Sequence, residues 1–184
     1  MQSWTTEAIV LKRVNVGEAD RVITVLTPDE GKLVCIAKGV RKMSSTQRAY
    51  LEPGNHVTTH LRSTSSLPII SQTQLLNQFA QSKQQLKRVK QVFEVLELAD
   101  VLFVENVEDQ EGFELVCQIL ETLNADSGNF RVVQDMLSQL FTHLGYQDLR
   151  ETQYSSILEY AAAVAERPVR SYEFLSVRHK GMVK

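Results

Sequence analysis

Residues 31–48, GKLVCIAKGVRKMSSTQR, carry five basic side chains and no carboxylate. The five are Lys32, Lys38, Arg41, Lys42 and Arg48. Lysine and arginine side chains without counter-charges attract phosphate groups, and every phosphate that they neutralise releases condensed counterions. A run of charge is normally only a solvated face, but a purely cationic stretch in a loop that leaves a strand favours a phosphate-contact interpretation.

Further basic residues flank this stretch. Lys12 and Arg13 are neighbours in a strand-like run, so their side chains point to opposite faces and at most one reaches the same groove. Arg21 follows Asp20 in a turn, where an acid beside a base more often forms a local ion pair than a phosphate contact. The sequence SKQQLKRVK (82–90) places Lys83, Lys87 and Lys90 within one turn of each other on a helix, with Arg88 beside them.

Residues suited to catalysis are few. His56 and His60 have the spacing of a helical metal-binding pair, but they lie in a strand-like segment, where that spacing puts them far apart along one face. A Gly-rich phosphate loop ending in Lys and Ser or Thr is absent from the sequence. The acids of ENVEDQEGFE (105–114) leave open a metal-dependent nuclease as an alternative.

The formal net charge of -2 hides a strong asymmetry. Residues 1–80 carry nine Lys and Arg against six Asp and Glu, whereas residues 91–166 carry two against fifteen. Such a chain can attract a polyanion at one end and repel it at the other. Cys35 and Cys117 each lie inside an apolar run, which favours reduced core thiols. With no leader sequence and no apolar run that could cross a bilayer, the expected location is the cytoplasm, away from membranes.

The first part of the chain alternates between strand-like runs and turns. Five runs rich in Val, Ile, Leu and Thr predict five strands, over 7–16, 20–28, 32–40, 56–64 and 66–76. The second and third runs are apolar on both faces, so that one face can fill a small barrel and the other needs a cover. The strand count favours an OB-fold, whose surface and loops are a common platform for oligonucleotides.

From about Phe79 the apolar period changes from two to 3.6 residues, which indicates helices. The first helix contains Leu86 to Phe103 and looks central in a bundle. Three more are expected: Gly112 to Leu123 with Asp109 as cap, Phe130 to Leu144 after the capping group 127–129, and Ser155 to Glu166 closed by Pro168. The predicted architecture is a two-domain β + α protein, with a five-stranded OB-fold barrel (1–79) packed on an all-α helical domain (80–184).

One long stretch, TEAIVLKRVNVGEADRVITVLTPDEGKLVCIAKGVRK (6–42), resembles the RecO family of bacterial recombination mediators. Members of this family typically show a strand ending in Leu-Lys, a Gly-Glu-x-Asp-Arg turn, then Thr-x-x-x-Gly-Lys and Ala-Lys-Gly-x-Arg. The resemblance continues in LEPGNHV (51–57) and, more loosely, in LFTHLGYQDL (140–149) and ERPVRSYEFL (166–175). It therefore covers nearly the whole chain.

The resemblance implies a non-enzymatic protein without cofactors, located at the bacterial nucleoid. It implies binding of single- and double-stranded DNA, annealing of complementary strands, contact with the single-stranded-DNA-binding protein, and joint action with RecR in loading the recombinase during repair. The acidic tail of the single-stranded-DNA-binding protein is one candidate occupant of the 82–90 cluster. The predicted DNA-binding residues are Lys12, Arg13, Arg21, Lys32, Lys38, Arg41, Lys42, Arg48, Lys83, Lys87 and Arg88.

The sequence departs from the family pattern at one point. Many members carry a Cys-x-x-Cys pair shortly after the counterpart of LGYQDL and a second pair further on, which together bind zinc. This chain has neither pair, and a tetrahedral structural zinc site needs four soft or imidazole ligands. We therefore expect no zinc module. A generic RNA-binding OB-fold protein remains an alternative function.

Overall fold

The computed structural model describes residues 2–79, 85–125, 130–166 and 169. The chain divides into two compact units. One unit contains residues 1–78 together with a distant segment, 104–113, and the other contains residues 79–103 and 114–184. The sequence assigned 104–113 to the helical half, so the barrel unit includes a segment that strand periodicity does not identify.

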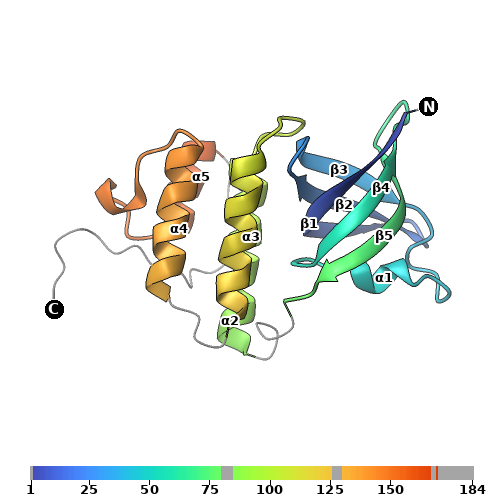
Figure 1. The fold of residues 1–184 in the computed structure, drawn as a ribbon, viewed down its shortest axis with the longest axis horizontal. Coiled ribbons are helices and arrows are strands. Elements are labelled where there is room, and N and C mark those ends of the chain that lie inside the picture. Colours follow the sequence, from blue (N-terminus) through green and yellow to red (C-terminus); the bar gives the residue numbers. More distant parts are fainter. Residues whose placement is uncertain (1, 80–84, 126–129, 167–168, 170–184) are drawn as a thin grey trace. The chain divides into compact units, whose positions relative to one another are not determined.

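The barrel unit is built from five strands, as predicted, and is shown in blue to green in Figure 1. They are β1 (Ser3–Val16), β2 (Asp20–Thr27), β3 (Gly31–Ala37), β4 (His56–Arg62) and β5 (Ile69–Asn77). The closed order is β1-β2-β3-β5-β4, in which all pairs are antiparallel except β3 and β5, which meet in parallel through Ile36 and Ile69. Closure removes the exposed edges that an open sheet would leave.

The barrel interior is filled by one face of each strand. Ile23 and Val25 of β2 lie inside with Leu33 and Cys35 of β3, and all four are buried. Alternation along the strands produces this arrangement, because successive side chains point to opposite faces. Burial in this core raises the pKa of the Cys35 thiol to about 12, so the thiol is protonated at neutral pH.

Segment 104–113 pairs with the turn between β2 and β3. The backbone N–H of Asn106 donates to the carbonyl of Lys32 at 3.0 Å, and that of Asp109 donates to the carbonyl of Pro28 at 3.3 Å. Gly31 permits this approach, because its φ is +61° and a Cβ there would lie 1.9 Å from the carbonyl oxygen of Val107. A residue with a side chain at position 31 would therefore displace the segment.

The connection between β3 and β4 includes a short helix that the sequence did not predict, α1 (Gln47–Tyr50). It is followed by Leu51, which is fully buried in the barrel core. The Asn55 side-chain amide donates to the carbonyls of Ala49 and Tyr50 at 3.0 Å each, which closes the helix end. Next to it, the N–H of Gly54 donates to the carbonyl of Val10, where β1 has an irregular register.

The second unit is helical. Its described helices are α2 (Leu86–Leu102), α3 (Gln110–Asn124, whose first residues belong to segment 104–113), α4 (Phe130–His143), α5 (Ile157–Ala165) and a short 3-10 turn at Leu149–Glu151. Asp109 caps α3 as predicted, since its Oδ1 accepts from the N–H of Gly112 at 2.8 Å. The expected caps at 127–129 and Pro168 lie outside the described residues. Within the described part of the chain, no helix is long and apolar enough to cross a membrane.

Candidate nucleic-acid interface

The cationic loop, which we define as residues 38–48, is held at its start by the turn between β1 and β2. The Asp20 carboxylate accepts from the N–H of Gly39 at 2.7 Å, and the N–H of Arg41 donates to the carbonyl of Ala19 at 2.9 Å. The Arg41 guanidinium also donates to the carbonyl of Gly17 at 2.9 Å. The Gly-Glu-x-Asp-Arg turn and the Ala-Lys-Gly-x-Arg segment are therefore parts of one hydrogen-bonded structure.

This arrangement leaves three cations of the loop at the surface. Lys38, Lys42 and Arg48 are exposed, whereas Arg41 is half-buried by its contact with the turn. Met43 lies between them and is fully exposed. The loop therefore presents a positively charged surface with no acid of its own, which is suited to contacts with a phosphate backbone.

Two predicted phosphate-binding residues are buried instead. Arg21 and Lys32 are each only 3% exposed. Arg21 does not pair with its neighbour Asp20; its guanidinium donates to the Asn15 side chain at 3.2 Å and to Glu52 Oε1 at 3.1 Å. Lys32 lies where segment 104–113 pairs with the barrel. Neither residue has the exposure that a contact with an extended polyanion needs, so we leave both out of the proposed surface.

Glu52 connects Arg21 with a second arginine. Its Oε2 accepts from Nε of Arg13 at 2.8 Å, so the one carboxylate bridges a buried and a partly exposed guanidinium. The LEPG segment that contains Glu52 thus has a clear structural role in the barrel. The Arg13 side chain is 33% exposed and is ion-paired with Glu52, and its neighbour Lys12 is also exposed.

The second basic cluster lies in the helical unit, and the structure describes only part of it. Lys83 lies outside the described residues. Lys87 is exposed near the start of α2. The Arg88 guanidinium instead donates to the backbone carbonyls of Leu123 and Ala125 at the end of α3. Arginine commonly satisfies the last carbonyls of a helix in this way, so Arg88 has a structural role.

The histidines of β4 contact different partners. His56 Nε2 lies 3.1 Å from Glu7 Oε2, and its ring meets the edge of Phe113 with centroids 5.9 Å apart. His60 Nδ1 lies 2.9 Å from the hydroxyl of Thr5. The two rings therefore do not form a pair, as the strand spacing indicated.

The acidic residues of 105–114 were considered as possible ligands of a nuclease metal ion. Glu105 lies where the segment bridges to Gly31, and Asp109 caps α3. No group of three or more His, Cys, Asp or Glu side chains is placed to hold a metal ion in the part of the chain described here. A strongly perturbed carboxylate lies elsewhere, in the helical unit, where hydrogen bonds from Arg150 hold the pKa of Asp148 far below its usual range.

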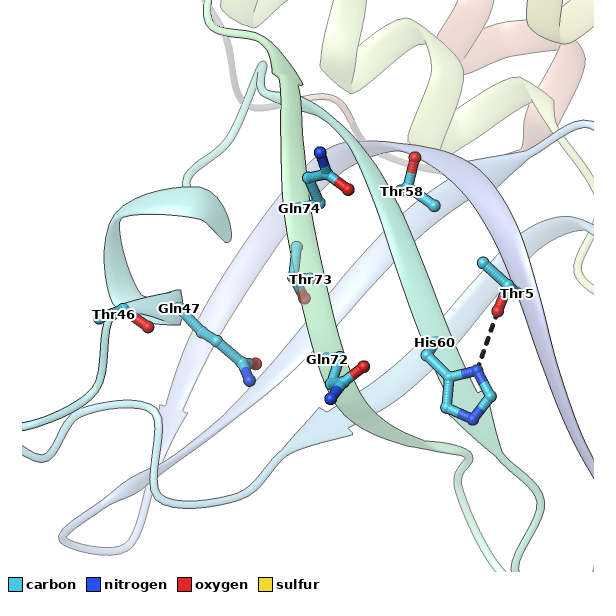
Figure 2. Close-up of a pocket in the computed structure, with 8 residues that line it drawn as sticks. All are labelled: Thr5, Thr46, Gln47, Thr58, His60, Gln72, Thr73 and Gln74. Carbon is cyan, nitrogen blue, oxygen red and sulfur yellow. Dashed lines mark hydrogen bonds between the residues drawn. The ribbon is translucent and has the colours of Figure 1, made fainter.

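A polar groove on the outside of the barrel was not anticipated from the sequence. It has a volume of about 370 Å³ and is shown in Figure 2. Its lining residues come from β1, the start of α1, β4 and β5: Thr5, Thr46, Gln47, Thr58, His60, Gln72, Thr73 and Gln74. The alternation of Gln and Thr along β5 was the only available signal, and it is also typical of any solvent-facing strand.

A closed five-stranded barrel with a basic loop after its third strand is an OB-fold domain, the class that the strand count predicted. Residues 1–79 match the family model described as Recombination protein O N terminal. The resemblance to RecO proteins that was seen in the sequence is therefore confirmed for this N-terminal domain.

Two curated relatives extend the match into the helical unit. The chain is 31% identical to the DNA repair protein RecO of Roseiflexus sp. (strain RS-1) over 144 residues, which is 78% of this chain and 50% of the relative. It is 26% identical to the DNA repair protein RecO of Syntrophomonas wolfei subsp. wolfei over 144 residues, 78% of this chain and 58% of that relative. The chain thus spans about half the length of the curated relatives it matches.

Proposed function

We propose that this protein is a non-enzymatic, DNA-binding recombination mediator that acts in DNA repair. The observation that carries the proposal is the cationic loop, which presents exposed Lys38, Lys42 and Arg48 with no acid among its residues. The loop belongs to the domain that matches the RecO family model, and the relatives are named DNA repair proteins. The proposed location is the cytoplasm, at the nucleoid.

In this proposal the loop binds the backbone of single- and double-stranded DNA. Attraction to phosphate is independent of sequence, so two complementary strands bound on such surfaces can meet and anneal. Together with RecR, and through contact with the single-stranded-DNA-binding protein, the protein would help to load the recombinase onto coated DNA. The exposed Lys12 and Lys87 are secondary candidates for contacts with DNA or with an acidic partner segment.

The loop is tested by the salt dependence of binding. We expect Lys38→Ser/Lys42→Ser/Arg48→Ser to weaken single-strand binding and to reduce the slope of log K against log salt by about 2, because each phosphate contact contributes about 0.7. Arg41 is left in place because it anchors the loop to Gly17. Arg62→Ser, which removes an exposed cation of β4, is the control and should change the slope by less than about 0.7, the contribution of one phosphate contact. An unchanged slope in the triple variant would assign these cations to solubility.

Mediator activity is tested separately by annealing. Complementary DNA strands, bare or coated with the single-stranded-DNA-binding protein, should anneal faster with this protein than without it, and RecR should be tested for its effect on recombinase loading. Labelled single strands with magnesium or manganese should stay intact. Cleavage that disappears in a Glu111→Gln variant would favour the nuclease alternative, and tighter binding to RNA than to matched DNA would favour the RNA-binding one.

A further inference from the structure

We propose that the polar groove binds the bases of single-stranded DNA through hydrogen bonds. This inference rests on the proposed function, because it adds base contacts to a domain whose cationic loop binds phosphates. The groove and the loop would then supply two different kinds of contact to one strand: a salt-sensitive contact to the backbone and a salt-insensitive contact to the base edges.

The chemistry of the groove favours bases over phosphates. Its eight lining residues carry hydroxyl, amide and imidazole groups, of which the Thr73 hydroxyl is itself buried, and none of them is Lys, Arg, Asp or Glu. Phosphate binding normally uses cations, and hydrocarbon binding uses apolar walls. Neutral amides and hydroxyls match the edges of nucleobases, which present donors and acceptors side by side, and a glutamine can bind one base edge with both its groups.

The strand register brings these groups together. Thr5, His60 and Gln72 form one row across β1, β4 and β5, and Thr58 and Gln74 lie beside each other in the next row. Figure 2 shows the hydrogen bond between Thr5 and His60, which holds the imidazole ring at the groove. Histidine rings can stack on an unpaired base. The volume of about 370 Å³ lies within the roughly 300–1,000 Å³ typical of small-ligand sites.

The groove is continuous with the cationic loop. Thr46 and Gln47 belong to the loop and also line the groove, and the next residue is the exposed Arg48. The Gln47 side-chain amide donates to the carbonyl of Ser71 in β5 at 3.1 Å, which ties the end of the loop to the strand that carries Gln72 and Gln74. A strand bound along the loop can therefore reach the groove without leaving the barrel.

The test compares base-bearing and base-free ligands. Gln72→Ala/Gln74→Ala removes two exposed amides of the groove, and Gln118→Ala/Gln139→Ala removes two exposed amides of the helical unit as a control. Affinities are measured for a single-stranded DNA oligomer, an abasic oligomer of equal length, and a duplex. We expect the groove variant to bind the single strand about tenfold more weakly, with unchanged affinity for the abasic oligomer and the duplex and an unchanged salt slope. Duplex binding is spared because paired bases hide the edges concerned.

Each outcome decides between the two proposals. Equal losses on the base-bearing and abasic oligomers, or no loss on either, would overturn the groove as a base site. If, in that case, the triple variant of the cationic loop still binds single-stranded DNA more weakly than the unmodified protein, the proposed function stands without the groove. If the unmodified protein binds none of the three ligands, the proposed function fails and the groove inference fails with it. Thermal unfolding of both double variants should match that of the unmodified protein.

Discussion

Gly31→Ala tests whether segment 104–113 is an integral part of the barrel unit. Gly31 has a φ of +61°, and an added Cβ would lie 1.9 Å from the carbonyl oxygen of Val107 and 3.4 Å from that of Val104. Both neighbours are backbone atoms, so no side-chain rotation relieves the clash. The segment must move away from the turn between β2 and β3.

The expected loss of stability has two parts. An alanine in the left-handed backbone region costs about 1–2 kcal/mol. Displacing the segment also breaks the hydrogen bonds from the Asn106 and Asp109 amides to the carbonyls of Lys32 and Pro28, each worth about 0.5–1.5 kcal/mol. The total is about 2–5 kcal/mol. Gly17→Ala is the matched control: its φ is +56° but nothing lies within 4 Å of the added Cβ, so it should cost only the backbone part, about 1–2 kcal/mol.

Urea denaturation measures the difference, with the fluorescence of Trp4 as the probe, because Trp4 is the only tryptophan and packs against the barrel core. Hydrogen exchange of the Asn106 amide reports directly on the segment and should accelerate in Gly31→Ala but not in Gly17→Ala. If the two variants lose the same stability and the Asn106 amide stays protected in both, the close approach of segment 104–113 does not require a glycine at position 31, and the prediction is refuted.

Two further predictions concern ion pairs. Glu52→Ala leaves the buried Arg21 without its carboxylate and should lower the free energy of unfolding by about 1–3 kcal/mol in the same urea assay. Arg13→Ala removes the partly exposed partner of Glu52 and should lower it by under about 1 kcal/mol. Equal losses in the two variants would contradict this prediction. Because Arg150 lowers the pKa of Asp148, the pair contributes stability above about pH 4 that is lost as the pH falls through the pKa of the folded state. Asp148→Asn should therefore have a lower free energy of unfolding than the unmodified protein at pH 7, and the two values should approach each other in acid. A difference in the free energy of unfolding that does not change with pH would count against the pair.

The sequence alone determined much of the fold, because the relevant signals are local. Runs of Val, Ile and Thr between turn residues predicted all five strands, and the change to a 3.6-residue period predicted the helices with Asp109 as a cap. The basic content of the loop and its position after β3 were equally evident. The short helix α1 was missed, since four residues of helix leave no periodic pattern.

The tertiary structure decided which cations are accessible and where polar groups meet. From the sequence, both Lys32 and Lys38 were predicted to bind DNA. In the structure, a segment some seventy residues away pairs with the barrel beside Lys32, which is buried, and leaves Lys38 exposed. Arg21 is buried because Glu52 and Asn15 reach it from other parts of the barrel. The polar groove likewise draws residues from four elements. Burial and convergence depend on contacts between residues far apart in the chain, and no local pattern of residues records them.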